Sequence, residues 1–279
     1  MEKSKLVFLS PFLFLLIFSI LPGLFLFVMS FYEWSIMTPV PEFIGLENYL
    51  YMFADEKFLQ SLFNSLYYTF FMVVLITPLS IIAALIFFYL GKLRNFFMAF
   101  FFFPMLVSLI VLGTVWSVMY FPFGPINNIL NMAGLPRINF YAKDIVKLAI
   151  IAVYVWRDTG YFGLMILGGL LSIPPSIFDS AKIDGASFTQ TLFKVTLPIL
   201  KPIIFLVVIL LTVGGFSVFS IPYIMTYGGP GYASMPLILY IYFSGWHFYK
   251  MGYASAQASI LLLIILAIYA VQKKYLGGT

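Results

Sequence analysis

The sequence contains several long stretches without a single charged residue, and three of them lie at positions 6–32, 64–90 and 96–121. A helix needs about 20 mostly apolar residues to cross the hydrocarbon core of a bilayer, so each stretch is long enough to span a membrane. The composition agrees, because 63% of the 279 residues are hydrophobic and only 9% are charged. Soluble domains carry about 25% charged residues and cannot be built from such a sequence. We therefore expect a polytopic membrane protein, and not a soluble, disordered or nucleic-acid-binding one.

Three further stretches are long enough to span, and they lie at positions 145–171, 198–221 and 255–272. The first of them holds a charged pair, Arg157–Asp158, at its centre. Six spans are therefore predicted. Segment 235–249 has only 15 largely apolar residues, a length that favours a re-entrant or interfacial helix over a full crossing.

Basic residues in the loops predict the orientation, since cytoplasmic loops collect Lys and Arg. With the N-terminus inside, nine basic residues fall on the cytoplasmic side: Lys3, Lys5, Lys92, Arg94, Lys182, Lys194, Lys201, Lys273 and Lys274. Five fall on the outer side: Lys57, Arg137, Lys143, Lys147 and Lys250. A seventh crossing at 235–249 would move Lys273 and Lys274 outside. The sequence thus predicts an all-α protein in which residues 1–279 form one transmembrane domain of six helices, with both termini in the cytoplasm.

The sequence offers few residues and no motifs suited to catalysis. It contains no cysteine and one histidine, His247, so thiol nucleophiles and metal sites built from these ligands are not expected. The G-x-x-x-x-G-K-[ST] phosphate loop, G-x-S-x-G and H-E-x-x-H are all missing from the sequence. We expect a chain that is not an enzyme and that must take any energy of ATP hydrolysis from a partner.

The hydrophilic segment 172–197 carries several helix signals on the predicted cytoplasmic side. Ser176 with Asp179, and Ser187 with Gln190, match capping-box patterns at the start of helices. Gly185 suits the left-handed position that ends a helix. These signals predict two short helices joined at Gly185.

The same segment carries a recognisable motif. The sequence D-S-A-K-I-D-G-A-S at 179–187, with L-P at 197–198, resembles the EAA loop of ABC-importer permeases, and K-I-D-G-A-S is typical of their carbohydrate-uptake branch. Asp179 stands where that family usually has Glu, and Ser180 where it has Ala. The resemblance extends to S-F-Y-E-W at 30–34, I-G-L-E-N-Y at 44–49, T-Y-G-G-P-G at 226–231 and G-Y-A-S-A at 252–256.

This resemblance implies a function and a set of partners. The chain would be the translocation subunit of an ATP-driven importer for a sugar, an oligosaccharide or a glycerol-phosphate-like solute. It would lie among the lipids of a bacterial or archaeal inner membrane and would bind no cofactor. Its partners would be a second permease subunit, two ATP-binding cassette ATPase subunits and an extracytoplasmic solute-binding protein. The glycine-rich segment 226–231 would lie near that binding protein.

The resemblance also implies that helix 175–184 couples the membrane spans to the ATPase. Asp179 would pair with a basic residue of the ATPase; the alternative is that, as the third residue of a capping box, it serves as a helix cap. The full set of predicted coupling residues is Ile177, Phe178, Asp179, Ala181, Asp184 and Gly185.

The substrate path is predicted from Trp116, Asp158 and Tyr161. Charged groups deep in a span are costly and usually face a cavity or a partner. Arg157 and Asp158 are neighbours that diverge by about 100° on a helix, so we expect them not simply to neutralise each other face to face. They serve interhelical pairing, contact with the second permease subunit, or the substrate path. The resemblance places a sugar-contacting tyrosine at Tyr161. Aromatic rings can lie against the C–H faces of sugars, which makes Trp116 a further candidate.

Two other classes of function are weighed against an importer subunit. A secondary transporter or channel would need a coupling-ion site, for which Asp158 is the one acidic candidate within a span. A membrane-embedded enzyme would need a nucleophile and base that the sequence does not provide. The EAA-like loop favours the importer, because a channel or an enzyme has no use for a docking helix there.

Overall fold

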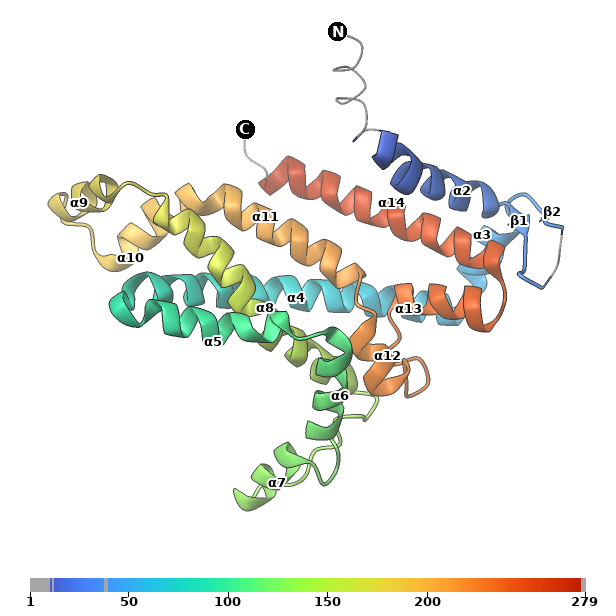
Figure 1. The fold of residues 1–279 in the computed structure, drawn as a ribbon, viewed down its shortest axis with the longest axis horizontal. Coiled ribbons are helices and arrows are strands. Elements are labelled where there is room, and N and C mark those ends of the chain that lie inside the picture. The colour runs from blue at the N-terminus through green and yellow to red at the C-terminus, as the bar shows by residue number, and fades with distance from the viewer. Residues whose placement is uncertain (1–10, 12, 38–39, 277–279) are drawn as a thin grey trace, which may run out of the picture. The chain divides into compact units, whose positions relative to one another are not determined.

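The computed structural model describes residues 11, 13–37 and 40–276. The described chain is almost entirely helical (Figure 1). Its helices are α2 (Leu21–Met29, preceded by a π-turn at Leu16–Ile20), α3 (Glu47–Ala54), α4 (Glu56–Tyr89), α5 (Arg94–Leu106, preceded by a 3-10 turn at Gly91–Leu93), α6 (Leu109–Met119), α7 (Pro125–Met132), α8 (Val146–Leu171), α9 (Pro175–Ile183), α10 (Phe188–Thr191), α11 (Leu197–Phe216), α12 (Ser220–Thr226), α13 (Leu237–Tyr242) and α14 (Met251–Leu276). Two-residue strands, β1 (Tyr32–Glu33) and β2 (Glu42–Phe43), form a small antiparallel hairpin with Tyr32 opposite Phe43.

Four helices of the described chain are long and apolar enough to cross a membrane: Glu56–Tyr89, Val146–Leu171, Phe188–Thr226 and Met251–Tyr275. A bent pair, Gly91–Leu106 with Leu109–Met119, counts as a fifth span if its two halves are taken together. The first predicted span, 6–32, is described as a helix from Leu13 to Met29. Residues 6–10 and 12, with Lys3 and Lys5, lie outside the described residues. The all-α membrane fold is confirmed, while the count of six spans stays a prediction.

The third predicted span, 96–121, is not one straight helix. Helices α5 and α6 meet at an angle of 96°. Val107 and Ser108 between them have extended backbone, with ψ values of 134° and 139°. Pro104 lies in the last turn of α5 and has no backbone N–H to continue the helical ladder. The stretch predicted as the third span is therefore a broken helix in the structure.

Two other segments contain π-turns that the sequence did not predict. The second of the two short helices, α10, does not end before the fifth span, because a π-turn at Leu192–Thr196 joins it to α11. Segment 235–249 contains α13 followed directly by a π-turn at Phe243–His247. That helix is too short to cross a bilayer, as its length predicted.

Contacts group the described chain into two compact units. The first contains the residues up to Gln60 together with Leu237–Leu266, and the second contains Ser61–Pro236 and the residues from Ala267 onward. The core of the second unit is centred on α8, which buries Ile150, Ile166 and Leu170. Gly160 allows α8 to pack closely against α5. A Cβ atom at this position would lie only 2.0 Å from the carbonyl oxygen of Phe101 on α5. Small residues at helix contacts are a common device in membrane proteins.

The first unit is organised around Asp55, which precedes α4. One carboxylate oxygen of Asp55 accepts the backbone N–H of Lys57 at 2.9 Å and so caps the helix. The other accepts the hydroxyl groups of Tyr240 at 2.6 Å and Tyr253 at 2.7 Å. A single carboxylate therefore ties the starts of α4 and α14 to α13.

Candidate functional site

The predicted coupling helix is α9, at the end of α8 and beside α10 (Figure 1). Pro174 and Pro175 precede and begin it. It ends in a Schellman motif, in which Gly185 N–H bonds the Lys182 carbonyl at 3.0 Å and Ala186 N–H bonds the Ala181 carbonyl at 2.9 Å. Gly185 has a φ of 74°, in the left-handed region that favours glycine. The predicted turn at Gly185 is confirmed.

One of the two predicted capping boxes forms. Ser187 and Gln190 exchange both hydrogen bonds, at 3.3 and 2.8 Å, and begin α10. The box predicted for Ser176 and Asp179 is wrong, because α9 already begins at Pro175 and its N-cap, Pro174, has no side-chain acceptor. Asp179 instead forms an exposed ion pair with Lys182 one turn further along α9, with 3.6 Å between Asp179 Oδ1 and Lys182 Nζ.

Helix α9 has two contrasting faces. Ala181 is buried, and Ile177 and Phe178 are half-buried against the core of the second unit. The ring of Phe178 lies 5.9 Å from that of Phe88 on α4. The opposite face, at i, i+3, i+4 and i+7 spacing, consists of Ser176, Asp179, Ser180 and Ile183, all of which are exposed. Ile183, the last residue of α9, is 85% exposed. We call these four residues the outer face of α9.

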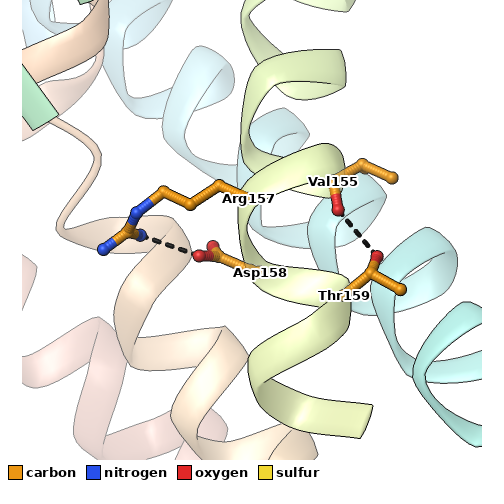
Figure 2. Close-up of polar contacts among 4 residues, drawn as sticks. All are labelled: Val155, Arg157, Asp158 and Thr159. Carbon is orange, nitrogen blue, oxygen red and sulfur yellow. Dashed lines mark hydrogen bonds and ion pairs between the residues drawn. The ribbon is translucent and has the colours of Figure 1, made fainter. Parts of the chain in front are cut away.

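The charged pair on α8 forms a direct ion pair. Arg157 Nη1 lies 2.7 Å from Asp158 Oδ1, and both side chains are largely buried (Figure 2). The sequence expectation that the two residues cannot neutralise each other was wrong. Their Cα–Cβ bonds do diverge, but the long arginine side chain turns its guanidinium back to its neighbour, as Figure 2 shows. Arg157 Nε is buried without a hydrogen-bond partner in the described structure.

The three predicted substrate residues do not converge on one another. Trp116, on α6, packs edge-to-face on Trp156 at 5.5 Å. Trp156 and Asp158 are two residues apart and therefore lie on roughly opposite sides of α8. Tyr161 is half-buried and stacks on Phe102 of α5 at 6.4 Å. The structure thus places these residues around α8 rather than in one pocket.

One aromatic feature was missed by the sequence reasoning. Tyr223 on α12 and the two residues that flank this helix, Phe219 and Tyr227, form a row with successive ring distances of 5.5 and 5.2 Å. Their i, i+4, i+8 spacing is visible in the sequence, but 56 aromatic residues in the chain make such spacings common. In the structure, the row lies just after the break between α11 and α12 at Ser217–Phe219, and this break is not visible in the sequence.

Comparison with known proteins identifies the family. Residues 76–276 match the family described as binding-protein-dependent transport system inner membrane component. The chain belongs to this family. The predicted resemblance to carbohydrate ABC-importer permeases is therefore confirmed, and the chain is a multi-pass membrane component of a transport system.

Several relatives align over nearly the whole permease. It is 34% identical to the probable ABC transporter permease protein YurN of Bacillus subtilis, over 98% of this chain and 97% of that protein. It is 34% identical to the sulfoquinovosyl glycerol transport system permease protein SmoG of Agrobacterium fabrum, over 87% of this chain and 80% of that protein. It is 33% identical to the trehalose/maltose transport system permease protein MalF of Thermococcus litoralis, over 91% and 85%.

A solved structure has the same fold. A chain from a bacterial alginate ABC transporter, crystallised with an alginate pentasaccharide-bound periplasmic protein, matches 98% of this permease and 93% of its own length. Its TM-score is 0.85 at 22% sequence identity. The likeness establishes the fold of the permease.

Proposed function

We propose that this permease is the translocation subunit of an ATP-driven importer for a sugar or oligosaccharide. Two of the three relatives named above support the substrate class, since their names specify a sugar or a sugar glycoside. A glycerol-phosphate-like solute is the second candidate substrate. The permease pairs with a second permease subunit, two ATPase subunits and an extracytoplasmic binding protein. It lies in the inner membrane with both termini in the cytoplasm.

The observation that carries this proposal is the construction of α9. It is a short, exposed helix held at both ends by long membrane helices: α8 ends at Leu171, and the α10–α11 helix begins at Phe188. Proline at its start and a Schellman turn at its end make it rigid relative to those helices. A rigid exposed element of this kind can receive force from a partner and pass it to two spans at once.

The two faces of α9 have different roles in coupling. Its outer face docks in a cleft of the ATPase, where Asp179 pairs with a basic group and Ile183 enters an apolar site. Asp184 and Gly185 set the end of the helix within that cleft. The other face transmits the movement, because Ile177, Phe178 and Ala181 pack on this chain's own core. Through Phe178 and Phe88 the movement reaches α4 as well as α8 and α11.

The substrate path runs along α8. Tyr161 offers a ring face and a hydroxyl group for a sugar, and Asp158 offers the carboxylate oxygen that Arg157 leaves available. Trp116 contributes from α6, on the other side of α8. One permease supplies only part of the wall of such a path, and the second permease completes it.

Reconstitution tests the function directly. The complete complex, in liposomes loaded with ATP, should take up labelled oligosaccharide only when the binding protein is present outside. The purified permease alone should catalyse no uptake. Uptake by the permease alone, driven by an ion gradient or by the substrate gradient, would instead establish a secondary transporter or a channel.

A further inference from the structure

The glycine-rich loop, which we define as residues 226–236, is held by several hydrogen bonds within the second unit. Inside the loop, the hydroxyl groups of Thr226 and Ser234 share a hydrogen bond of 2.7 Å. Ser234 Oγ also donates to the carbonyl of Gly229 at 2.7 Å. Tyr227, Gly228, Gly231 and Tyr232 all have positive φ, so the chain turns sharply several times over a short distance. The loop is therefore a folded element with a defined shape.

A buried asparagine fixes the loop to α4. Asn64 is 1% exposed, and its Nδ2 donates to the carbonyls of Tyr232 and Met235, both at 2.9 Å. Tyr68, one turn further along α4 and fully buried, donates its hydroxyl hydrogen to the Ser234 carbonyl at 3.0 Å. Three hydrogen bonds from one face of α4 therefore anchor the loop at the carbonyls of Tyr232, Ser234 and Met235.

A lysine on another helix sets the orientation of that asparagine. Lys147, in the first turn of α8, donates to Asn64 Oδ1 at 3.2 Å. A cation can bond only the oxygen of an amide, so Lys147 leaves the amide nitrogen of Asn64 facing the loop carbonyls. The ammonium group also lies over the rings of Tyr67 and Phe63, at 4.6 and 5.3 Å. No carboxylate among the described residues forms an ion pair with Lys147.

The side of the loop that faces away from these anchors is open. Tyr227 is 51% exposed, and Pro230 and Gly231 are also exposed, whereas Ala233, Ser234 and Met235 are buried. We call Tyr227, Pro230 and Gly231 the tip of the loop. A rigid base with an exposed tip is the arrangement of a preorganised docking element, which loses little conformational freedom when a partner binds.

We propose that Asn64, oriented by Lys147, is a positioning residue that presents the tip to the extracytoplasmic binding protein and links it to α4 and α8. This inference rests on the proposed function, which supplies the partner. Docking at the tip then acts on α4 through Asn64 and Tyr68, and on α8 through Lys147. Of these, α8 leads directly to α9, so one helix connects the docking element to the coupling helix.

The test measures ATP hydrolysis by the reconstituted complex against the concentration of sugar-loaded binding protein. Asn64→Ala removes both donors to the loop. We expect the half-saturating concentration of binding protein to rise about tenfold, as loss of one net hydrogen bond of binding energy would produce. Basal hydrolysis without binding protein should stay within about twofold of wild type. Lys147→Met, which keeps the side-chain stem but not the charge, should raise the half-saturating concentration less.

Asn127 provides a matched control. It is also fully buried, and its amide likewise makes three hydrogen bonds, to Phe121 and Ile138 in a different loop. Asn127→Ala should destabilise the permease to a similar degree but leave the half-saturating concentration unchanged. An equal rise in both variants would overturn the inference, because it would show general loosening.

Further variants keep the test decisive. If Asn64→Ala does not assemble, Tyr68→Phe removes a single anchoring hydroxyl and should still raise the half-saturating concentration severalfold. Tyr227→Ala alters the exposed tip without touching the anchors and should do the same. Unchanged half-saturation in these variants, while the wild-type complex responds to binding protein, would refute the positioning role. A wild-type complex that does not respond at all would refute the proposed function instead.

Discussion

Arg157 Nη1 lies 2.7 Å from Asp158 Oδ1, although the two residues are sequence neighbours on the same helix. The pair is largely buried, so removing one partner leaves an uncompensated charge inside a span. We expect Asp158→Asn to lower the free energy of unfolding in detergent by about 3 kcal/mol or more. The measurement is thermal denaturation of the purified permease.

Replacing both partners separates packing from transport. The double variant Arg157→Met with Asp158→Leu removes both charges and should recover most of the lost stability. If Asp158 contacts the substrate, the double variant should still fail to support uptake. Recovery of both stability and uptake would assign the pair to packing alone.

Tyr161 is an uncharged residue of the proposed substrate path, and its replacement tests that path. Tyr161→Ala removes a ring that stacks on Phe102 and a hydroxyl group suited to sugars. We expect the substrate concentration for half-maximal uptake to rise about tenfold, equivalent to ~1.4 kcal/mol of lost contact, with basal ATP hydrolysis retained. Tyr161→Phe is the control: it keeps the ring, so an intermediate result would divide the effect between ring and hydroxyl. Uptake that is unchanged in Tyr161→Ala would remove this residue from the path.

The orientation of the chain can be tested cleanly because it has no cysteine. Asn131 on α7 and Lys274 near the end of α14 are both exposed. With six spans and the termini inside, a membrane-impermeant thiol reagent should label Asn131→Cys in intact cells and Lys274→Cys only after the membrane is opened. Labelling of Lys274→Cys in intact cells would mean that the number of crossings is odd or the orientation reversed.

Asp55 gives the first unit a predicted pH dependence. Burial acts to raise the pKa of its carboxyl group, but the hydrogen bonds from Tyr240, Tyr253 and the backbone outweigh burial and hold the pKa below its ordinary value of 3.8. A lowered pKa in the folded state means that ionised Asp55 stabilises the fold above the ordinary value, and that this stability is lost as the pH falls through the lowered pKa. Thermal stability of the wild type should therefore drop below about pH 4 more steeply than that of Asp55→Asn. Parallel curves for the two proteins would show that Asp55 does not contribute.

Local signals made parts of this permease predictable. The bounds of α8, the turn at Gly185 and the capping box at Ser187 each depend on a few adjacent residues, and all three are present in the structure. The break at Val107–Ser108 was missed, because apolar composition is the same in a straight and in a broken span. The arrangement of Phe178 against Phe88, and of Asn64 beneath residues 226–236, depends on contacts between distant segments, and one sequence does not reveal these.

The coupling helix provides the sharpest test of the proposed function, because its two faces predict different defects. Ile183 is 85% exposed, so Ile183→Ser should change the stability of the permease by no more than about 0.5 kcal/mol. It should nevertheless weaken association with the ATPase, measured as subunit release during purification. Phe178→Ala instead removes contacts with this chain's own core. It should leave the ATPase bound but reduce the stimulation of hydrolysis by binding protein.

Asp179 and Gly185 complete the test. Asp179 does not cap α9, and its exposed pair with Lys182 contributes only about 0.5 kcal/mol or less, so Asp179→Asn should insert and fold normally. If Asp179 pairs with the ATPase, stimulated hydrolysis and uptake should fall together in this variant. At Gly185 an added Cβ atom meets no atom within 4 Å, so the main cost of substitution is the left-handed backbone. Gly185→Val should therefore uncouple the complex, whereas Gly185→Asn, which tolerates positive φ better, should retain more coupling. Full coupling in Asp179→Asn, Ile183→Ser and Gly185→Val alike would exclude α9 as the docking element.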